Sequence, residues 1–162
     1  MALETKTRVM IVDDHRIFRD NLKRLILTLE NFEVVAEAGG MSAGLHGVLW
    51  LVPDLVTVDI SLPDRNGIFL TRQIKQRHPQ IQVLVITVHS SRAYIDEALQ
   101  AGANGYLLKA SAADQALPAI QAVAGGRFYG DTTLPADWMV SSWRYHGPTP
   151  ARAGDKPDAP SR

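Results

Sequence analysis

The chain reads LVTVDISLP over residues 55–63, an apolar run that ends in the carboxylate of Asp59. Continuous apolar runs of this length are typical of strands buried on both faces of a parallel sheet. Such sheets place their sites at the carboxyl ends of the strands. Three further runs end in the same way and so predict one polar site at that edge. They are VMIV at 9–12 before Asp13-Asp14, VLVI at 83–86 before Thr87, and YLL at 106–108 before Lys109.

Short apolar runs alternate with segments of helical periodicity along most of the chain. In residues 15–29, for example, Phe18, Leu22 and Leu29 recur on one face of a 3.6-residue helix. Repeated strand–helix alternation predicts a doubly wound α/β fold, with a five-stranded parallel sheet of order 2-1-3-4-5 and helices on both faces. The strands are expected at 8–12, 33–37, 55–58, 82–87 and 105–108, and the helices at 15–29, 42–51, 67–77, 91–101 and from about 111 onward.

Polar residues mark the expected helix starts. Ser42 is a candidate N-cap for the second helix, and Ser90 or Ser91 for the fourth. Ser111-x-x-Asp114 resembles a capping box at the start of the fifth helix. Pro118 conflicts with that helix because proline lacks the backbone donor. Either the helix kinks at Pro118 or its regular part begins there.

The character of the chain changes after Gly125-Gly126. Residues 134–143 contain Trp138 and Trp143 and favour one short helix. From Gly147 onward the chain is rich in proline, alanine and charge and lacks apolar periodicity, which is typical of disorder. We therefore expect three parts: a folded domain at 5–127, a C-terminal extension with a linker helix at 128–143, and a disordered tail at 144–162.

Composition excludes several classes of function. The formal net charge of the 162 residues is zero, so no global field draws the chain to nucleic acid. The absence of cysteine excludes disulfides, thiol catalysis and thiolate metal sites. No apolar run is long enough to span a membrane, and the N-terminus lacks a secretory pattern. We expect a cytoplasmic protein with no membrane partner.

The three acids suit a divalent cation. Mg²⁺ prefers oxygen ligands, keeps several waters and commonly uses one or two carboxylates. Asp14 and Asp59 are expected to be direct ligands, with Asp13 acting through water. The backbone carbonyl of Ser61, just after Asp59, would supply another oxygen. His15 follows the acids, but such a residue usually just begins a helix, and we favour that interpretation.

The same edge also suits a phosphoryl group. A carboxylate and a phosphoryl group repel each other until a cation lies between them. Lys109 would pair with one phosphoryl oxygen, and the hydroxyl of Thr87 would donate a hydrogen bond to another. Asp59 lies on a central strand without an adjacent acid, which makes it the expected nucleophile.

These residues, taken together, resemble the receiver domain of bacterial two-component response regulators over roughly 7–127. VDDH at 12–15, GYLLK at 105–109 and GGRFY at 125–129 are similar to the LuxR/NarL-type subfamily. The residues that carry the resemblance are Val12-Asp13-Asp14-His15, Asp59, Pro63, Gly67, Thr87 and Gly105-Tyr106-Leu107-Leu108-Lys109.

The resemblance implies a flavodoxin-like (CheY-like) fold, Mg²⁺, and a phosphorelay in which a sensor histidine kinase phosphorylates Asp59. Asp13 and Asp14 map onto the family's metal-binding acids, Lys109 onto its lysine, and Thr87 with Tyr106 onto its switch pair. In that family the switch remodels the surface of the fourth helix, fifth strand and fifth helix. The resemblance implies no enzyme beyond self-catalysed phosphotransfer and autodephosphorylation.

The output stays open at this stage. LuxR/NarL regulators usually carry a DNA-binding helix-turn-helix, and this sequence stops at Arg162, about where that domain would begin. We therefore expect either the input half of a DNA-binding transcription regulator or a receiver that works alone or through its tail. Pro118 lies in a helix that the family often uses for partner contacts, so the mode of any homodimer is open.

Two functions of other classes also use parts of this pattern. A Mg²⁺-dependent aspartate-nucleophile phosphatase needs an acid two residues after the nucleophile to protonate the leaving group, and this chain has Ser61 at that position. A flavodoxin needs donors for a phosphate after its first strand, where Asp13 and Asp14 would repel it. We rank the phosphatase below the receiver and the flavodoxin last.

Overall fold

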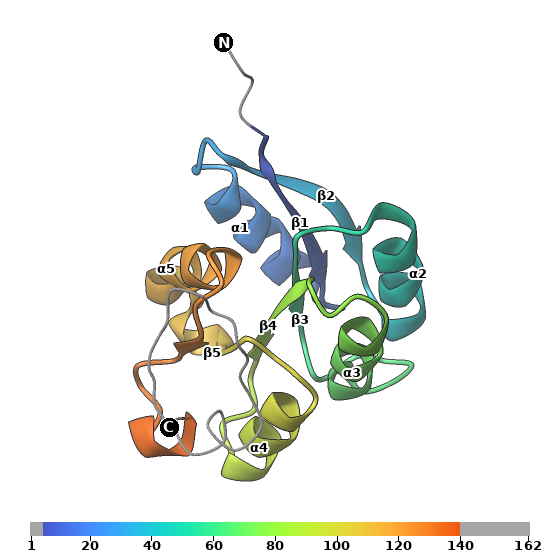
Figure 1. Cartoon of the computed structure of the whole chain (residues 1–162). Coiled ribbons are helices and arrows are strands. Elements are labelled where there is room, and N and C mark those ends of the chain that lie inside the picture. The colour runs from blue at the N-terminus through green and yellow to red at the C-terminus, as the bar shows by residue number, and fades with distance from the viewer. Residues whose placement is uncertain (1–4, 140–162) are drawn as a thin grey trace.

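The computed structural model describes residues 5–139 as alternating strands and helices (Figure 1). The strands are β1 (Thr7–Val12), β2 (Phe32–Ala38), β3 (Leu55–Val58), β4 (Gln82–Thr87), β5 (Gly105–Leu108) and β6 (Tyr129–Gly130). The helices are α1 (Arg16–Ile26), α2 (Met41–Leu51), α3 (Gly67–Arg77), α4 (Arg92–Gln100) and α5 (Ala112–Ala124), with a 3-10 turn at Lys109–Ser111. Within these residues no helix is both long and apolar enough to cross a membrane.

The strands form one sheet of order β2-β1-β3-β4-β5-β6. Every adjacent pair is parallel, which confirms the predicted order 2-1-3-4-5. β6 is an addition that the sequence did not predict, because a two-residue strand has no recognisable pattern. It pairs with β5 through Gly105 opposite Tyr129 and Tyr106 opposite Gly130.

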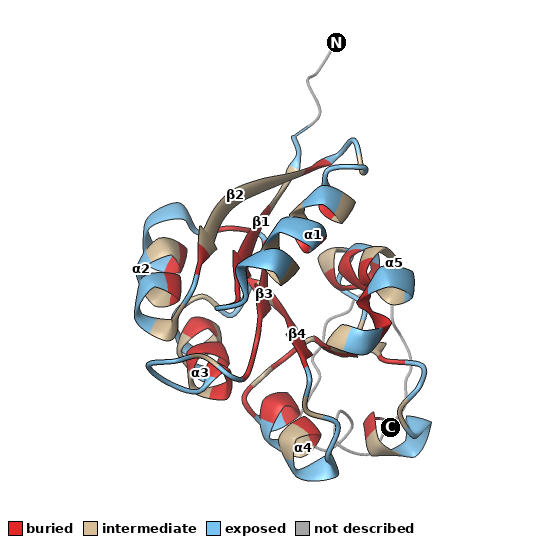
Figure 2. Ribbon diagram, turned by 180° about the vertical axis from the view of Figure 1, so that it is seen from behind, coloured by how far each residue is buried: buried red, intermediate tan, exposed pale blue. Residues whose placement is uncertain are grey.

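Alternation along the strands divides the core into two layers (Figure 2). On β1, Met10 and Val12 pack on one face with side chains from α2, α3 and α4. Val9 and Ile11 pack on the other face with side chains from α1 and α5. Successive strand residues point to opposite faces, so one continuous apolar run fills both layers. This arrangement sets the polar residues that follow each strand at one edge of the sheet.

One end of α1 and the start of α2 differ from the prediction. α1 ends at Ile26, earlier than residue 29, and the hydroxyl of Thr28 donates to the Leu25 carbonyl in the turn that follows. α2 begins after Gly40, so Ser42 is not its N-cap. Asp64 caps α2 instead, since its carboxylate accepts the N–H groups of Met41 at 2.7 Å and Ser42 at 3.0 Å. Asp64 lies 23 residues from Met41, beyond the reach of a local capping pattern.

Serine caps were expected at the starts of α4 and α5, and only the one at α4 is present. Ser91 accepts from the N–H of Tyr94 at the start of α4, which decides between Ser90 and Ser91. Ser111 makes no side-chain capping bond to α5, so the proposed capping box is wrong. α5 begins at Ala112 and carries Pro118 in its interior, which rules out a start at Pro118.

The C-terminal extension is described only in part. Residues 136–139 form one helical turn, which lies within the helix predicted for 134–143. Residues 140–143, with Trp143, and the tail predicted for 144–162 lie outside the described residues. The division at 127 and 143 stays a prediction.

Replacing Pro118 with alanine should stabilise the protein. Pro118 is exposed, so little packing is lost, and alanine restores a donor for the carbonyl of Asp114. The rigidity of proline in the unfolded chain offsets roughly 1 kcal/mol of the gain. We expect Pro118→Ala to raise the free energy of unfolding by about 2 kcal/mol in urea titrations. Gln121→Ala, exposed on the same helix, should change it by less than about 0.5 kcal/mol. A destabilised Pro118→Ala would contradict this account of α5.

Candidate functional site

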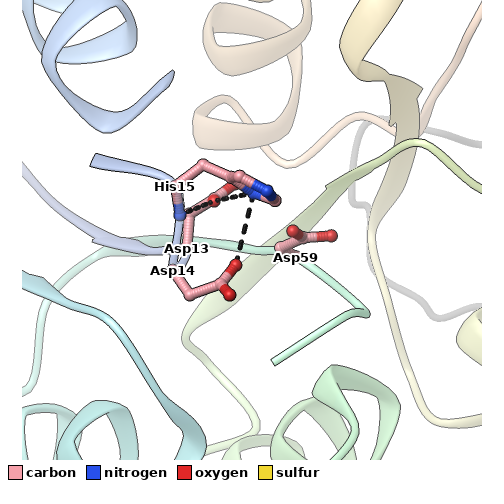
Figure 3. Close-up of side chains that lie close together, drawn as sticks. All are labelled: Asp13, Asp14, His15 and Asp59. Carbon is pink, nitrogen blue, oxygen red and sulfur yellow. Dashed lines mark hydrogen bonds and ion pairs between the residues drawn. The ribbon is translucent and has the colours of Figure 1, made fainter. Parts of the chain in front are cut away.

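Three carboxylates meet because β1 and β3 are neighbours in register. Val12 lies opposite Val58, so the residues that follow them are side by side. The N–H of Asp59 donates to the carbonyl of Val12 at 3.0 Å and fixes this register past the strand ends. One ligand atom from each of Asp13, Asp14, His15 and Asp59 lies within 4.8 Å of the others (Figure 3).

Lys109 extends from the end of β5 into this cluster. Its ammonium lies 2.8 Å from Oδ2 of Asp13 and 3.0 Å from Oδ2 of Asp59. The side chains of these acids are only 3% and 1% exposed, and that of Lys109 is 12% exposed. Burial alone would lower the pKa of Lys109, but the two carboxylates outweigh it and raise the pKa above its usual value. Lys109 is therefore a stable ammonium that bridges two buried acids.

Backbone N–H groups bind the remaining oxygens of both buried acids. Oδ1 of Asp13 accepts from the N–H of His15 at 2.8 Å, and Oδ1 of Asp59 accepts from the N–H of Ser61 at 3.2 Å. Asp14 is the exposed acid of the cluster. The site therefore combines a fixed inner pair with one carboxylate open to solvent.

His15 does more than begin α1. It occupies the N-cap position without a side-chain capping bond. Its Nδ1 lies 3.3 Å from an oxygen of Asp13, 3.3 Å from one of Asp14 and 3.1 Å from the ammonium of Lys109. The sequence predicts His15 only as a helix start, and its position directly after two acids is the one signal of this contact.

Thr87 and Tyr106 meet at His89. The N–H of His89 donates to the Thr87 hydroxyl at 3.4 Å, and the Tyr106 hydroxyl donates to the His89 carbonyl at 2.8 Å. The ring of His89 stacks on Tyr94 at 4.2 Å, and its Nε2 lies 2.7 Å from the Ser61 hydroxyl. Burial raises the pKa of Tyr106, whose side chain is fully enclosed. His89 thus connects both predicted switch residues to the loop after Asp59.

Gly67 closes the loop that carries Asp59. Its N–H donates to the carbonyl of Ile60 at 2.8 Å. A Cβ at this position would overlap the backbone carbonyl of Asp59. The loop therefore packs directly against the backbone of Asp59, and only glycine fits there.

Comparison with known proteins identifies the family. The model of the response regulator receiver domain matches residues 9–121. The chain belongs to the response regulator receiver domain family. It is a receiver of two-component signalling, and its relatives are LuxR/NarL-type regulators, as the sequence indicated. The match favours the receiver over the phosphatase and the flavodoxin.

Two curated relatives illustrate the similarity. Transcriptional regulatory protein DegU of Brevibacillus brevis is 38% identical over 78% of this chain and 53% of its own length. Response regulator GacA of Pseudomonas viridiflava is 33% identical over 85% of this chain and 64% of its own length. The receiver chain thus spans between about half and two thirds of these relatives.

Solved structures agree with the fold. A LuxR-family two-component response regulator from an Aurantimonas species has a TM-score of 0.78 at 34% identity, over 85% of this chain and 97% of that one. The signal receiver domain of the putative response regulator NarL from Mycobacterium tuberculosis has a TM-score of 0.72 at 32% identity, over 76% and 99%.

The residues present fit the divalent cation that receiver domains generally bind at an acidic pocket. Lys109 binds Oδ2 of Asp13 and of Asp59, which leaves the carboxylate of Asp14 as the solvent-facing ligand group. Carboxylate oxygens are the ligands that Mg²⁺ prefers. The role of the Ser61 carbonyl as a further ligand stays a prediction.

Replacing Gly67 with alanine should destabilise the protein. The methyl group cannot fit beside the Asp59 carbonyl, so the loop or α3 must shift. We expect the free energy of unfolding to fall by about 3 kcal/mol in urea titrations followed by circular dichroism. At Gly39 the nearest atom to a new Cβ is the Arg19 guanidinium at 3.6 Å, an ordinary contact. Gly39→Ala should therefore change stability by less than roughly 1 kcal/mol, and equal losses in the two variants would refute the close approach at Gly67.

Removing the charge of Lys109 should destabilise the fold. Lys109→Met leaves Asp13 and Asp59 buried without a counter-ion. We expect a loss of about 3 kcal/mol at neutral pH without divalent cations, measured by chemical denaturation. Lys23, which is 44% exposed and pairs with Glu37, is the control. Lys23→Met should cost less than about 1 kcal/mol. A Lys109→Met protein as stable as the wild type would mean that the two acids do not need the ammonium.

Proposed function

We propose that this receiver accepts a phosphoryl group on Asp59 from a sensor histidine kinase in a Mg²⁺-dependent reaction. One observation carries the proposal. The Asp59 carboxylate lies among Asp13, Asp14 and the Lys109 ammonium, so a nucleophile, metal-binding acids and a cation for the phosphoryl oxygens occupy one edge of the sheet. Family membership supports the same reaction.

The chain's own residues would divide the work. One oxygen of Asp59 attacks phosphorus, the bond from phosphorus to the donor's nitrogen or oxygen breaks, and the donor leaves with that electron pair. The Lys109 ammonium pairs with a phosphoryl oxygen, and the Thr87 hydroxyl donates to another. Asp13, Asp14 and the Ser61 carbonyl would hold Mg²⁺ with Asp59. When bound, the ion neutralises charge between the carboxylate and the phosphoryl group.

Phosphorylation would then change the surface formed by α4, β5 and α5. Thr87 and Tyr106 are both hydrogen-bonded to the backbone of His89. A movement of the Thr87 hydroxyl toward a phosphoryl oxygen therefore breaks or shifts the bond to the His89 N–H, and with it the position of the His89 carbonyl that Tyr106 uses. This is a two-state element biased by a new local charge.

For the output, the names of the relatives favour transcription regulation. DegU is named a transcriptional regulatory protein and GacA a response regulator. We place this receiver as the input half of a cytoplasmic LuxR-type regulator that reaches DNA through a C-terminal domain and forms a homodimer there. The phosphatase is the weaker candidate because Ser61, two residues after Asp59, cannot donate a proton to a leaving group as an acid would.

The reaction can be tested with a small acyl-phosphate donor such as acetyl phosphate. We expect intact-mass spectra to show one added phosphoryl group on the wild-type chain with Mg²⁺ and none after chelation. Asp59→Asn should show none under either condition because an amide is a poor nucleophile.

Asp64→Asn is the matched control. Asp64 lies in the same loop, but its carboxylate binds the start of α2 rather than the site. This variant should be phosphorylated like the wild type. An unmodified wild-type protein that is folded and binds Mg²⁺, or a modified Asp59→Asn, would overturn the proposed role of Asp59.

A further inference from the structure

Arg19 on α1 binds the backbone of the acidic cluster. Its Nη1 donates to the carbonyl oxygen of Asp13 at 2.6 Å. That carbonyl belongs to the peptide group between Asp13 and Asp14, the two adjacent acids of the cluster (Figure 3). Because a peptide group is planar, a hydrogen bond to its oxygen restrains the backbone on both sides, and so the directions in which the two side chains leave it.

The end of β2 holds Asp13 by both of its backbone polar groups. The N–H of Asp13 donates to the carbonyl of Ala38 at 2.9 Å. The residue before Ala38 is Glu37, whose carboxylate pairs with Nε of Arg19 at 3.2 Å. Neighbouring residues of β2 therefore hold the N–H of Asp13 directly and its carbonyl through Arg19.

The pair of Arg19 and Glu37 is partly enclosed and kept ionised. The two side chains are 19% and 24% exposed. Lys23, one turn further along α1, lies 3.1 Å from the other oxygen of Glu37. Burial would raise the pKa of Glu37, but the hydrogen bonds and charges of Lys23 and Arg19 lower it overall. The planar guanidinium can thus contact a carboxylate and a carbonyl at the same time, which a single ammonium does not do in this geometry.

The charge of Arg19 and its hydrogen bond have opposite effects on a cation at the cluster. A guanidinium close to the acids repels Mg²⁺, so by charge alone its removal would strengthen binding. The hydrogen bond to the Asp13 carbonyl favours binding, because it restrains two ligand-bearing residues before the ion arrives. Partners behind metal ligands typically change metal affinity by about 10- to 100-fold, which exceeds the effect of one partly screened charge.

We propose that Arg19, held by Glu37, is a positioning residue that sets the Mg²⁺ affinity of this receiver by fixing the peptide group between Asp13 and Asp14. Arg19 acts through the backbone of Asp13 and is not a ligand, since a guanidinium cannot bind a cation. The inference rests on the proposed function of the acidic cluster and adds α1 and the end of β2 to the elements that shape it.

Metal binding by the full chain tests the proposal. Mn²⁺ affinity is measured from the loss of the free-ion electron paramagnetic resonance signal, and Mg²⁺ affinity by competition. Arg19→Met should weaken Mg²⁺ binding by about tenfold, although it removes a positive charge. The control is Arg16→Met, which removes the same charge from an 82% exposed side chain on α1 and should change the affinity by less than about twofold. Unchanged or tighter binding in Arg19→Met would overturn the proposal.

Arg19→Lys separates the charge from the geometry. Lysine keeps the positive charge but lacks the fork that contacts the Asp13 carbonyl and Glu37 together. We expect Mg²⁺ binding about threefold weaker than in the wild type, between the wild type and Arg19→Met. Circular dichroism checks that each variant is folded before titration. If Arg19→Met does not fold, Arg19→Lys decides alone, and wild-type affinity in it would overturn the proposal.

The Mg²⁺ dependence of phosphorylation gives a second readout. With acetyl phosphate as the donor, Arg19→Met should need about tenfold more Mg²⁺ for its half-maximal rate and should reach the wild-type rate at saturating Mg²⁺. A residue that only stabilises the fold would instead lower the rate at every Mg²⁺ concentration. That result, with an unchanged half-saturation, would overturn the proposal.

Failure of this inference and failure of the proposed function can be told apart. Equal Mg²⁺ affinities in the wild type and Arg19→Met, with phosphorylation of both, would overturn the role of Arg19 and leave the role of Asp59 standing. A wild type that binds Mg²⁺ but is not phosphorylated would overturn the proposed role of Asp59. In that case weaker metal binding in Arg19→Met would still support its positioning role, and equal binding would overturn it.

Discussion

The ammonium of Lys109 bridges Asp13 and Asp59, and most of the site depends on this contact. Two carboxylates with almost no solvent exposure repel each other strongly, and each also loses its hydration. A single cation from β5 compensates both and at the same time joins the ends of three strands. In the proposed reaction the same ammonium pairs with a phosphoryl oxygen, so phosphorylation of Asp59 would change the contacts of Lys109 at the end of β5.

The loop after β3 is fixed at several points. Near its start, the N–H of Ser61 binds the Asp59 carboxylate. In the middle, Asp64 accepts two N–H groups from the start of α2. At its end, Gly67 packs under the backbone of Asp59. The contacts of Ser61 and Gly67 hold Asp59 itself, so its carboxylate loses little conformational freedom in a reaction, which is the benefit of pre-organisation. The Asp64 contacts connect the loop to α2.

Strand positions and the strand order could be read from the sequence because apolar runs such as 9–12 and 83–86 alternate with segments of helical periodicity, which is typical of a buried parallel sheet. The residues at the strand ends followed from the same rule. Contacts between segments far apart in the chain could not be predicted, because no local sequence pattern encodes them. Asp64 caps a helix 23 residues away, and His15 contacts Lys109 across 94 residues. Local patterns at Ser42 and Ser111 pointed to caps that tertiary contacts replace or leave unused.

β6 replaces β5 as the edge strand of the sheet. Without it, β5 would be an edge strand with unpaired backbone groups, and such edges recruit strands from other molecules. Tyr129, Gly130 and Asp131 instead pair with the backbone of Asn104, Tyr106 and Leu108. The new edge is only two residues long, too short to template another strand. A chain cut after residue 127 would keep the cluster of Asp13, Asp59 and Lys109 but lose Met139 from the core and expose a longer edge, which favours aggregation through strand pairing.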